Sequence, residues 1–162
     1  MDFGLDLKLL ILIGVANGAP VVAQNLFGHR FAFPVDCGAK LADGQPLLGD
    51  SKSLRGIALS VLGTIAAAPL LGIAWQVGAL ISAAAMLGDL CSSFLKRRMK
   101  MPASSMAIGL DQLPESLFPM LVCLPVFALS AWDIADVTVC FCAGELLVSR
   151  LLYRFHLRDR PY

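Results

Sequence analysis

Long apolar runs without a charged residue divide the chain and predict membrane-spanning helices. No Asp, Glu, Lys or Arg occurs at positions 9–29, 56–88 or 116–132, and the apolar residues in these runs are contiguous rather than alternating. A spanning helix needs roughly 20 mostly apolar residues, whereas a barrel strand needs about 9–11 that alternate with polar ones. The second run is too long for one span, and its glycines at 72 and 78 offer a turn, so it predicts a helical hairpin.

These runs predict an all-α membrane protein, in which a single domain over residues 1–162 forms a bundle of five transmembrane helices. The expected spans lie at about 5–27, 57–75, 77–95, 113–131 and 134–153. Two polar loops, after the first and third spans, would then emerge on the same side of the bilayer.

The composition agrees with a bilayer as the solvent of this chain. Hydrophobic residues make up 57% of the sequence, charged residues 15%, and the mean hydropathy is +0.74. A soluble domain usually carries about a quarter charged residues. These values exclude a soluble enzyme, a disordered chain and a secreted disulfide scaffold.

The basic residues predict the orientation of the bundle. Twelve of the thirteen Lys and Arg residues fall in the two polar loops or at the C-terminal end, and only Lys8 falls on the other side. Loops rich in Lys and Arg stay in the cytoplasm. We therefore expect the N-terminus outside, the C-terminus in the cytoplasm, and a multi-pass protein of the plasma or inner membrane.

The first polar loop carries residues suited to binding phosphate or a metal. Asp36, Asp43 and Asp50 occur within a stretch rich in Gly that also holds Lys52 and Arg55. Gly and Asp favour turns with exposed backbone N–H groups, which can cradle phosphate oxygens, and carboxylates beside them can hold Mg²⁺. A plain polar connection between two helices would have a similar composition.

The end of the third span places a carboxylate, hydroxyls and cations on one helix face. Asp89, Ser92, Ser93, Lys96 and Arg97 are spaced i, i+3, i+4, i+7 and i+8. Such positions share one side of a helix, so this side forms a bed for a metal and a polyphosphate. Alternatively, the basic run is a topology signal or lipid-headgroup anchor, and the acid is a packing or proton-relay residue.

Further polar groups lie at the start of the fourth span and inside the first. Asp111 and Glu115 either stabilise the helix N-terminus or add metal ligands at the same membrane face. Asn17 and Gln24 are polar at membrane depth around Pro20. A kink is the default reading of this segment, and the lining of a cytoplasm-facing cavity is the functional one.

Seven short motifs resemble the CDP-archaeol synthase family, which consists of small five-helix membrane cytidylyltransferases. They occur in the family's order and cover roughly residues 15–115: Asn17-Gly18-Ala19-Pro20, Pro34-Val35-Asp36-Cys37-Gly38, Asp43-Gly44, Gly49-Asp50-Ser51-Lys52-Ser53-Leu54-Arg55-Gly56, Gly88-Asp89-Leu90, Ser93-Phe94-Leu95-Lys96-Arg97-Arg98 and Leu110-Asp111-Gln112. The stretch 88–116 is also similar to the C-terminal signature of the larger phosphatidate cytidylyltransferases.

The chain departs from these patterns at three positions. Ala103 stands where the family usually has Gly, and Ser53 stands where Thr is common. The second position of the Asp pair of the phosphatidate enzymes is not acidic in this chain, so only Asp111 matches that pair.

The resemblance implies transfer of a cytidylyl group from CTP to a membrane lipid phosphate, giving a CDP-lipid and pyrophosphate. It implies Mg²⁺ as cofactor and CTP, a lipid phosphate and membrane lipids as partners, with no nucleic acid; it is compatible with a homo-oligomer. The implied catalytic residues are Asp89, Asp111 and Lys96, with Asp89 and Asp111 as first metal ligands and Asp36, Asp43 and Asp50 as second candidates. The implied binders of CTP and the lipid phosphate are Asn17, Lys52, Arg55, Ser93, Arg97 and Arg98.

Two other function classes remain open at this point. In a small transporter or channel, Asp89 and Glu145 would be intramembrane ion or proton sites. In a membrane scaffold, the basic loops would bind anionic lipid. A CDP-alcohol phosphotransferase is excluded, since Asp43-Gly44 is not followed by that enzyme's Ala-Arg pair.

Overall fold

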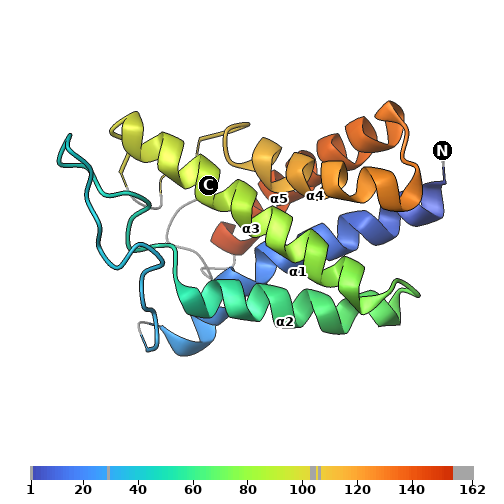
Figure 1. The fold of residues 1–162 in the computed structure, drawn as a ribbon, viewed down its shortest axis with the longest axis horizontal. Helices are drawn as coiled ribbons and strands as arrows, with labels where there is room; N and C mark the ends of the chain where they lie inside the picture. Colours follow the sequence, from blue (N-terminus) through green and yellow to red (C-terminus); the bar gives the residue numbers. More distant parts are fainter. Residues whose placement is uncertain (1, 29, 103–104, 106, 155–162) are drawn as a thin grey trace.

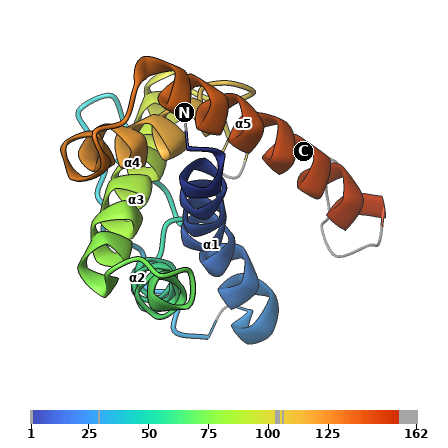
Figure 2. The same ribbon diagram turned by 90° about the vertical axis from the view of Figure 1, so that its right-hand side faces the viewer.

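The computed structural model describes residues 2–28, 30–102, 105 and 107–154. Over these residues the chain forms α1 (Phe3–Phe27), α2 (Leu54–Leu70), α3 (Trp75–Arg98), α4 (Gln112–Phe127) and α5 (Ala131–Arg154). Helices α1 to α4 pack together, while the second half of α5 projects away from them (Figure 1, Figure 2). Ala103 and the tail residues Arg158 and Arg160 lie outside the described residues.

The helices follow the predicted spans, with different ends where turns intervene. Helix α2 ends at Leu70 rather than near 75, because Gly72 turns the chain with a φ of +72° and the N–H groups of Gly72 and Ile73 bond the carbonyls of the last turn. Gly78 lies inside α3 rather than in the turn. A Cβ atom added there would come within 2.7 Å of the Thr64 carbonyl oxygen, so this glycine lets α2 and α3 pack closely.

The fourth helix is also shorter than its predicted span of 113–131. It ends at Phe127, because Ala128 adopts the left-handed conformation and its N–H bonds the Leu124 carbonyl. Ser130 and Asp133 then start α5 as a capping pair: Asp133 Oδ2 accepts from the Ser130 N–H at 2.7 Å, and Ser130 Oγ accepts from the Asp133 N–H at 3.3 Å.

The outside of the bundle is apolar, as expected for a protein in lipid. In the described part of the chain, α1 and α3 are long and apolar enough to cross a membrane, and α2 and α4 are shorter apolar helices. Large side chains such as Leu62, Leu87 and Val139 are more than half exposed on the helices. Exposed apolar surface on this scale marks contact with lipid or a partner.

The interior combines an apolar core with buried hydroxyl groups. The core cluster comes from all five helices and includes Leu9, Leu12, Ile13, Ala68, Ile81, Met120, Cys123, Val137 and Phe141. Pro20 does not break α1, although it lacks the N–H that would bond the Ala16 carbonyl. Ser60 of α2 donates its hydroxyl to that carbonyl at 2.7 Å and so satisfies it.

The connections alternate between the two ends of the bundle. The segments 28–53 (loop one) and 99–111 (loop three) lie at the same end, and the short turns 71–74 and 128–130 lie at the other (Figure 1). The basic residues of the two loops and of the end of α3 therefore gather at one end, as the charge pattern predicts.

Candidate active site

One ion pair of the site joins loop one to α3. Lys52 Nζ donates to Asp89 Oδ1 at 2.5 Å, and the two side chains are 20% and 18% exposed. The backbone of Lys52 is held by a hydrogen bond from Val35 N to Lys52 O at 2.8 Å and by the bridge between Pro34 and Ser53. This loop therefore delivers its ammonium group to the α3 carboxylate.

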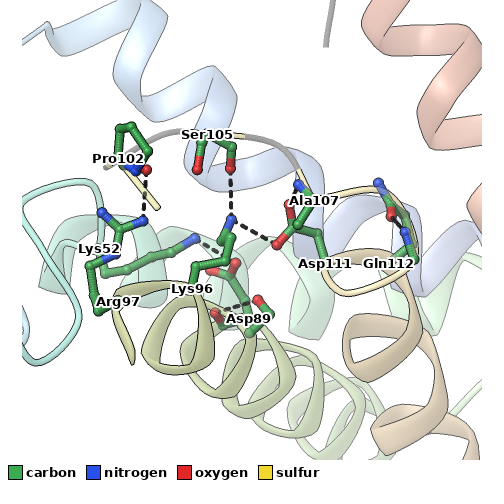
Figure 3. A network of polar contacts seen from close by, with 11 residues as sticks. Lys52, Asp89, Lys96, Arg97, Pro102, Ser105, Ala107, Asp111 and Gln112 are labelled. Atoms are coloured by element: carbon green, nitrogen blue, oxygen red, sulfur yellow. Dashed lines mark hydrogen bonds and ion pairs between the residues drawn. The ribbon is translucent and has the colours of Figure 1, made fainter. Parts of the chain in front are cut away.

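The polar face predicted on α3 is confirmed by its burial. Ser92, Ser93, Lys96 and Arg97 are each at most 7% exposed, so this side of the helix faces protein rather than lipid. Ser92 Oγ donates to its own helix at the Asp89 carbonyl, 2.9 Å away. The side chains of Lys52, Lys96 and Asp89 converge above this face, with Asp111 opposite (Figure 3).

A second ion pair joins α3 to the start of α4. Lys96 Nζ lies 2.7 Å from Asp111 Oδ1 and donates to the Ser105 carbonyl at 2.9 Å. Asp111 Oδ2 accepts from the Ala107 N–H at 3.0 Å, and Arg97 donates to the Pro102 carbonyl at 2.8 Å (Figure 3). Lys96 and Arg97 of α3 thus bind backbone carbonyls of loop three and hold it beside the site.

A third carboxylate, which the motifs do not mark, completes this group. Glu115 is 7% exposed, and its backbone N would lie 2.8 Å from a Cβ atom on Gly88, the residue before Asp89. Asp111, the N-cap residue of α4, lies one turn before Glu115, and Lys96 and Asp89 are two turns apart on α3. The i, i+4 spacing of the two α4 acids was the available signal that both face α3.

Asp36 organises loop one. Its Oδ2 accepts from the N–H groups of Leu48 at 2.8 Å and Gly49 at 3.0 Å, and its Oδ1 accepts from Gly38 at 3.0 Å. Burial raises the pKa of this carboxyl group, but the three backbone hydrogen bonds outweigh it and hold the pKa below its ordinary value. Both carboxylate oxygens already accept hydrogen bonds from the backbone of loop one. Asp36 therefore affects the site by fixing the loop that carries Lys52.

Replacing Asp36 with Ala is expected to loosen loop one without unfolding the bundle. Three N–H groups would lose their acceptor, at a cost of about 1–3 kcal/mol for each one left buried. Limited proteolysis should then cut within residues 36–50 at least several-fold faster than in the wild type. Unchanged cleavage, with Asp2→Ala at the opposite end as control, would contradict this role.

Arg98 and Asp43 link loop one to the end of α3. They form an ion pair, and Arg98 also donates to the Pro46 carbonyl at 2.6 Å and lies over the Phe94 ring. A hydrogen bond from the Gln45 N–H lowers the pKa of Asp43, and Arg98 lowers it further. Arg98, a predicted phosphate binder, and Asp43, a predicted metal ligand, are therefore partners of each other.

Arg55 and Asn17 contact the protein's own backbone. Arg55 donates to the Arg30 carbonyl, to Gln24 Oε1 at 2.9 Å and to the Gly28 carbonyl at 3.1 Å, so it closes the end of α1 against the start of α2. Asn17 donates to the Ile13 carbonyl at 3.1 Å. None of these four bonds joins Arg55 or Asn17 to the carboxylates above α3.

The remaining metal candidate, Asp50, is exposed on loop one, beside the buried Gly49. Within the described residues, no three His, Cys, Asp or Glu side chains come together as a self-sufficient metal site. The carboxylates of Asp89 and Asp111 do lie at the same end of the bundle. This donor set suits Mg²⁺, which takes one or two carboxylates and completes its shell with phosphate and water.

This arrangement suits an anionic substrate that carries its own metal-binding oxygens. Lys52 and Lys96 are already removed from bulk water and oriented by carboxylates. Phosphate oxygens can replace those carboxylates as partners, because Lys acts as a compact charge on a flexible stem. Both pairs are largely shielded from water, which strengthens each such contact.

Comparison with known proteins identifies relatives over nearly the whole chain. The model of the CarS-like CDP-archaeol synthase family matches residues 71–162. The CDP-archaeol synthase of Sulfurisphaera tokodaii is 32% identical, covering 91% of this chain and 89% of the relative. The enzyme of Sulfolobus acidocaldarius is 33% identical, covering 98% and 99%.

A solved structure has the same fold. It is described as an intramembrane enzyme for archaeal membrane lipid biosynthesis and superposes with a TM-score of 0.77 at 28% identity. The match covers 87% of this chain and 90% of the other.

Proposed function

The chain belongs to the CDP-archaeol synthase family of CTP:lipid-phosphate cytidylyltransferases, and from this premise we propose its substrate and its use of Mg²⁺. The acceptor is an archaetidic or phosphatidic acid-like lipid phosphate. One of its oxygens attacks the α-phosphorus of CTP, the bond to the β-phosphate bridge breaks, and CDP-lipid and pyrophosphate are the products.

The observation that carries this proposal is the pairing of Lys52 and Lys96 with carboxylates, beside the buried Arg97, at one end of a lipid-facing bundle. A lipid phosphate is anionic at neutral pH, so it needs no strong general base. The difficulty lies in bringing two polyanions together, and catalysis consists mainly of positioning and charge stabilisation. The ammonium groups of Lys52 and Lys96 bind the phosphates, and Arg97 keeps loop three closed over them.

Asp89 and Asp111 are the proposed ligands of Mg²⁺, with Asp43 and Asp50 as further carboxylates near the entrance. When bound, the ion neutralises the triphosphate and polarises the α-phosphorus. The carboxylate of Asp89 is 18% exposed and so remains accessible from the polar end. Ser93 lies on the same buried face, where its hydroxyl can donate to a phosphate oxygen.

We further propose that the five helices all span the membrane, with the polar end in the cytoplasm. The gathering of basic residues at that end supports this orientation. CTP then reaches the site from water, while the lipid chains approach from the bilayer between helices. Both substrates meet at one polar surface.

Turnover is expected to require a divalent cation. With purified protein, CTP and a lipid phosphate, the rate of CDP-lipid formation should fall by at least ~100-fold when excess chelator removes the metal. Added Mg²⁺ should restore the rate. CDP-lipid measured by mass spectrometry reports the result. Undiminished turnover in chelator would overturn the metal assignment.

The acceptor can be identified with a panel of lipid phosphates. Ether-linked and ester-linked diacyl or dialkyl glycerol phosphates, and a lipid alcohol without phosphate, are each incubated with the protein, CTP and Mg²⁺. A CDP-lipid should form with one or both phosphate classes and not with the alcohol. Failure of every lipid phosphate to react would contradict the proposed function.

A further inference from the structure

A groove between loop one and the end of α3 lies on the opposite side of α3 from the ion pairs. Its volume is about 430 Å³, which falls within the range of small-molecule sites. Around the helix axis, its α3 residues are centred about half a turn away from Asp89 and Lys96. The walls are six apolar side chains, Leu47 and Leu48 from loop one and Leu90, Cys91, Phe94 and Leu95 from α3.

The groove continues along α3 as an exposed apolar stripe that ends at a cation. Leu87 is 55% exposed and lies one turn before the groove wall at Leu90 and Cys91. Arg98, the last residue of α3, lies one turn after Phe94, and its guanidinium carbon is 5.3 Å from the centre of the Phe94 ring. The stripe therefore has an apolar body and a basic end.

The length of this stripe matches one leaflet of a bilayer. Positions 87 and 98 are 11 residues apart, which is about 16 Å along a helix axis. One leaflet contributes half of the ~30 Å hydrocarbon core. Because α3 is long and apolar enough to cross a membrane, a lipid in the leaflet at the polar end can lay one hydrocarbon chain along the stripe and place its headgroup at Arg98.

The basic end of the stripe carries more positive than negative charge. Arg98 pairs with Asp43 and donates to the Pro46 carbonyl at 2.6 Å. A guanidinium group has five N–H donors, so these two bonds leave others for a further acceptor. Lys40 forms a β-bridge with Pro46, Lys100 follows the end of α3, and both lysines are exposed. A cluster of cations beside an apolar groove favours an anionic phospholipid over a neutral one.

We propose that this groove binds one anionic phospholipid of the bilayer, with a hydrocarbon chain along α3 and the phosphate at Arg98. This bound lipid is distinct from the reacting lipid phosphate, because the groove faces away from Lys96 on the opposite side of α3. The inference goes beyond the proposed function and shares with it only the placement of the polar end at the membrane surface.

The bound lipid also stabilises loop one. Leu47 and Leu48 form one wall of the groove, and the Leu48 N–H is bonded by Asp36 Oδ2 at 2.8 Å. The same loop brings Lys52 to Asp89. A hydrocarbon chain in the groove adds apolar contacts to this wall, so anionic lipid should slow proteolytic cleavage within residues 36–50.

Photo-crosslinking with lipids of defined headgroup tests the site. The protein is reconstituted in phosphatidylcholine vesicles with a trace of phosphatidylglycerol or phosphatidylcholine that carries a diazirine in one hydrocarbon chain, and labelled peptides are identified by mass spectrometry. Phosphatidylglycerol is a phosphodiester, so it lacks the free phosphate that the proposed reaction needs. Its label should concentrate at residues 47–48 and 90–95, several-fold above that of phosphatidylcholine. Equal labelling by both lipids, or label spread evenly over the lipid-facing helices, would overturn the proposal.

Two kinds of variant separate the apolar groove from its basic end. Leu90→Trp fills the groove and should lower the labelling of residues 47–48 by either lipid several-fold. Val139→Trp is the matched control, because Val139 is 65% exposed on α5, away from the groove. Labelling of residues 47–48 in Leu90→Trp at the wild-type level would overturn the groove as the site. Thermal unfolding confirms that each protein compared is folded.

The basic end is tested by removing charge. Arg98→Gln should remove most of the preference for phosphatidylglycerol over phosphatidylcholine. Because Arg98 also holds loop one, the double variant Lys40→Gln/Lys100→Gln lowers the charge and leaves the bonds of Arg98 in place; it should reduce the preference at least twofold. Arg150→Gln, an exposed cation of α5, should keep the wild-type preference. An unchanged preference in Arg98→Gln and in the double variant would overturn the role of the cations.

Failure of this inference differs from failure of the proposed function. If CDP-lipid forms but phosphatidylglycerol labels no preferred position, the groove is not a lipid site and the reaction stands. If the groove is labelled as expected but no lipid phosphate reacts with CTP, the lipid site stands and the substrate proposal is wrong.

Discussion

Replacing Asp89 with Asn should abolish CDP-lipid formation and leave the protein inserted and folded. The amide has the same shape as the carboxylate but removes the charge that pairs with Lys52 and holds the proposed metal. Loss of a directly placed electrostatic group commonly lowers turnover on the order of 10²–10³-fold, and loss of a metal ligand adds to this. Transfer of label from CTP into lipid is the measurement.

Folding is expected to survive this substitution because Asn and Asp have nearly the same size and shape. Size-exclusion behaviour and the melting temperature in detergent should match those of the wild type within a few degrees. Asp136→Asn, an exposed acid at the opposite end of the bundle, serves as the matched control and should keep full turnover. Full turnover in Asp89→Asn would remove Asp89 from the mechanism.

Gly88→Ala should destabilise the whole bundle and inactivate the enzyme. The added methyl group would stand 2.2 Å from the Pro114 carbonyl oxygen and 2.5 Å from its carbon, both of which are backbone atoms that cannot rotate away. Forcing extra volume into a packed contact costs about 1–3 kcal/mol or more. A cost of ~3 kcal/mol corresponds to a fall in melting temperature of roughly 6–12 °C.

Activity should fall further than stability, because separating α3 from α4 also pulls Lys96 from Asp111. Gly14→Ala is the control, since nothing lies within 4 Å of a Cβ atom at this position of α1. This variant should melt at or slightly above the wild-type temperature, because Ala favours a helix by ~1 kcal/mol over Gly. Equal melting temperatures for both variants would contradict the prediction, because they would show that α3 and α4 accommodate the extra methyl group at position 88.

The sequence predicted the helices well because each depends on a local property. An uninterrupted apolar run can be stable in lipid only as a helix, so the number and order of the helices follow from the runs. The ends were less accurate, as α2 and α4 show. Their ends depend on Gly72 and Ala128, whose positive φ angles are not specified by the apolar runs.

The candidate site was predictable where its geometry is periodic. The face of α3 with Asp89 and Lys96 follows from helical spacing alone, and its burial confirms it. The contact of Lys52 with Asp89 joins residues 37 positions apart, and no local rule specifies it. The sequence likewise could not predict that Lys96 bonds the Ser105 carbonyl, because every residue type carries a backbone carbonyl.

Several predicted phosphate binders received other partners for a physical reason. Arg55 and Arg98 each have several donors, and the ends of α1 and loop one present carbonyl oxygens that need them. A basic residue in a motif shows that a cation is present, but only the packing of helices and loops decides which acceptor lies within reach.

The amino-acid order by itself determined a lipid-embedded helical bundle, its polar end and the family to which its motifs point, since each follows from composition or short-range spacing. The tertiary structure alone decided which part of α4 lies against the segment of Asp89. The backbone of Pro114 and Glu115 reaches this segment because Gly88 lacks a side chain. That close approach between two helices is a property of their packing, and no single segment of the chain contains it.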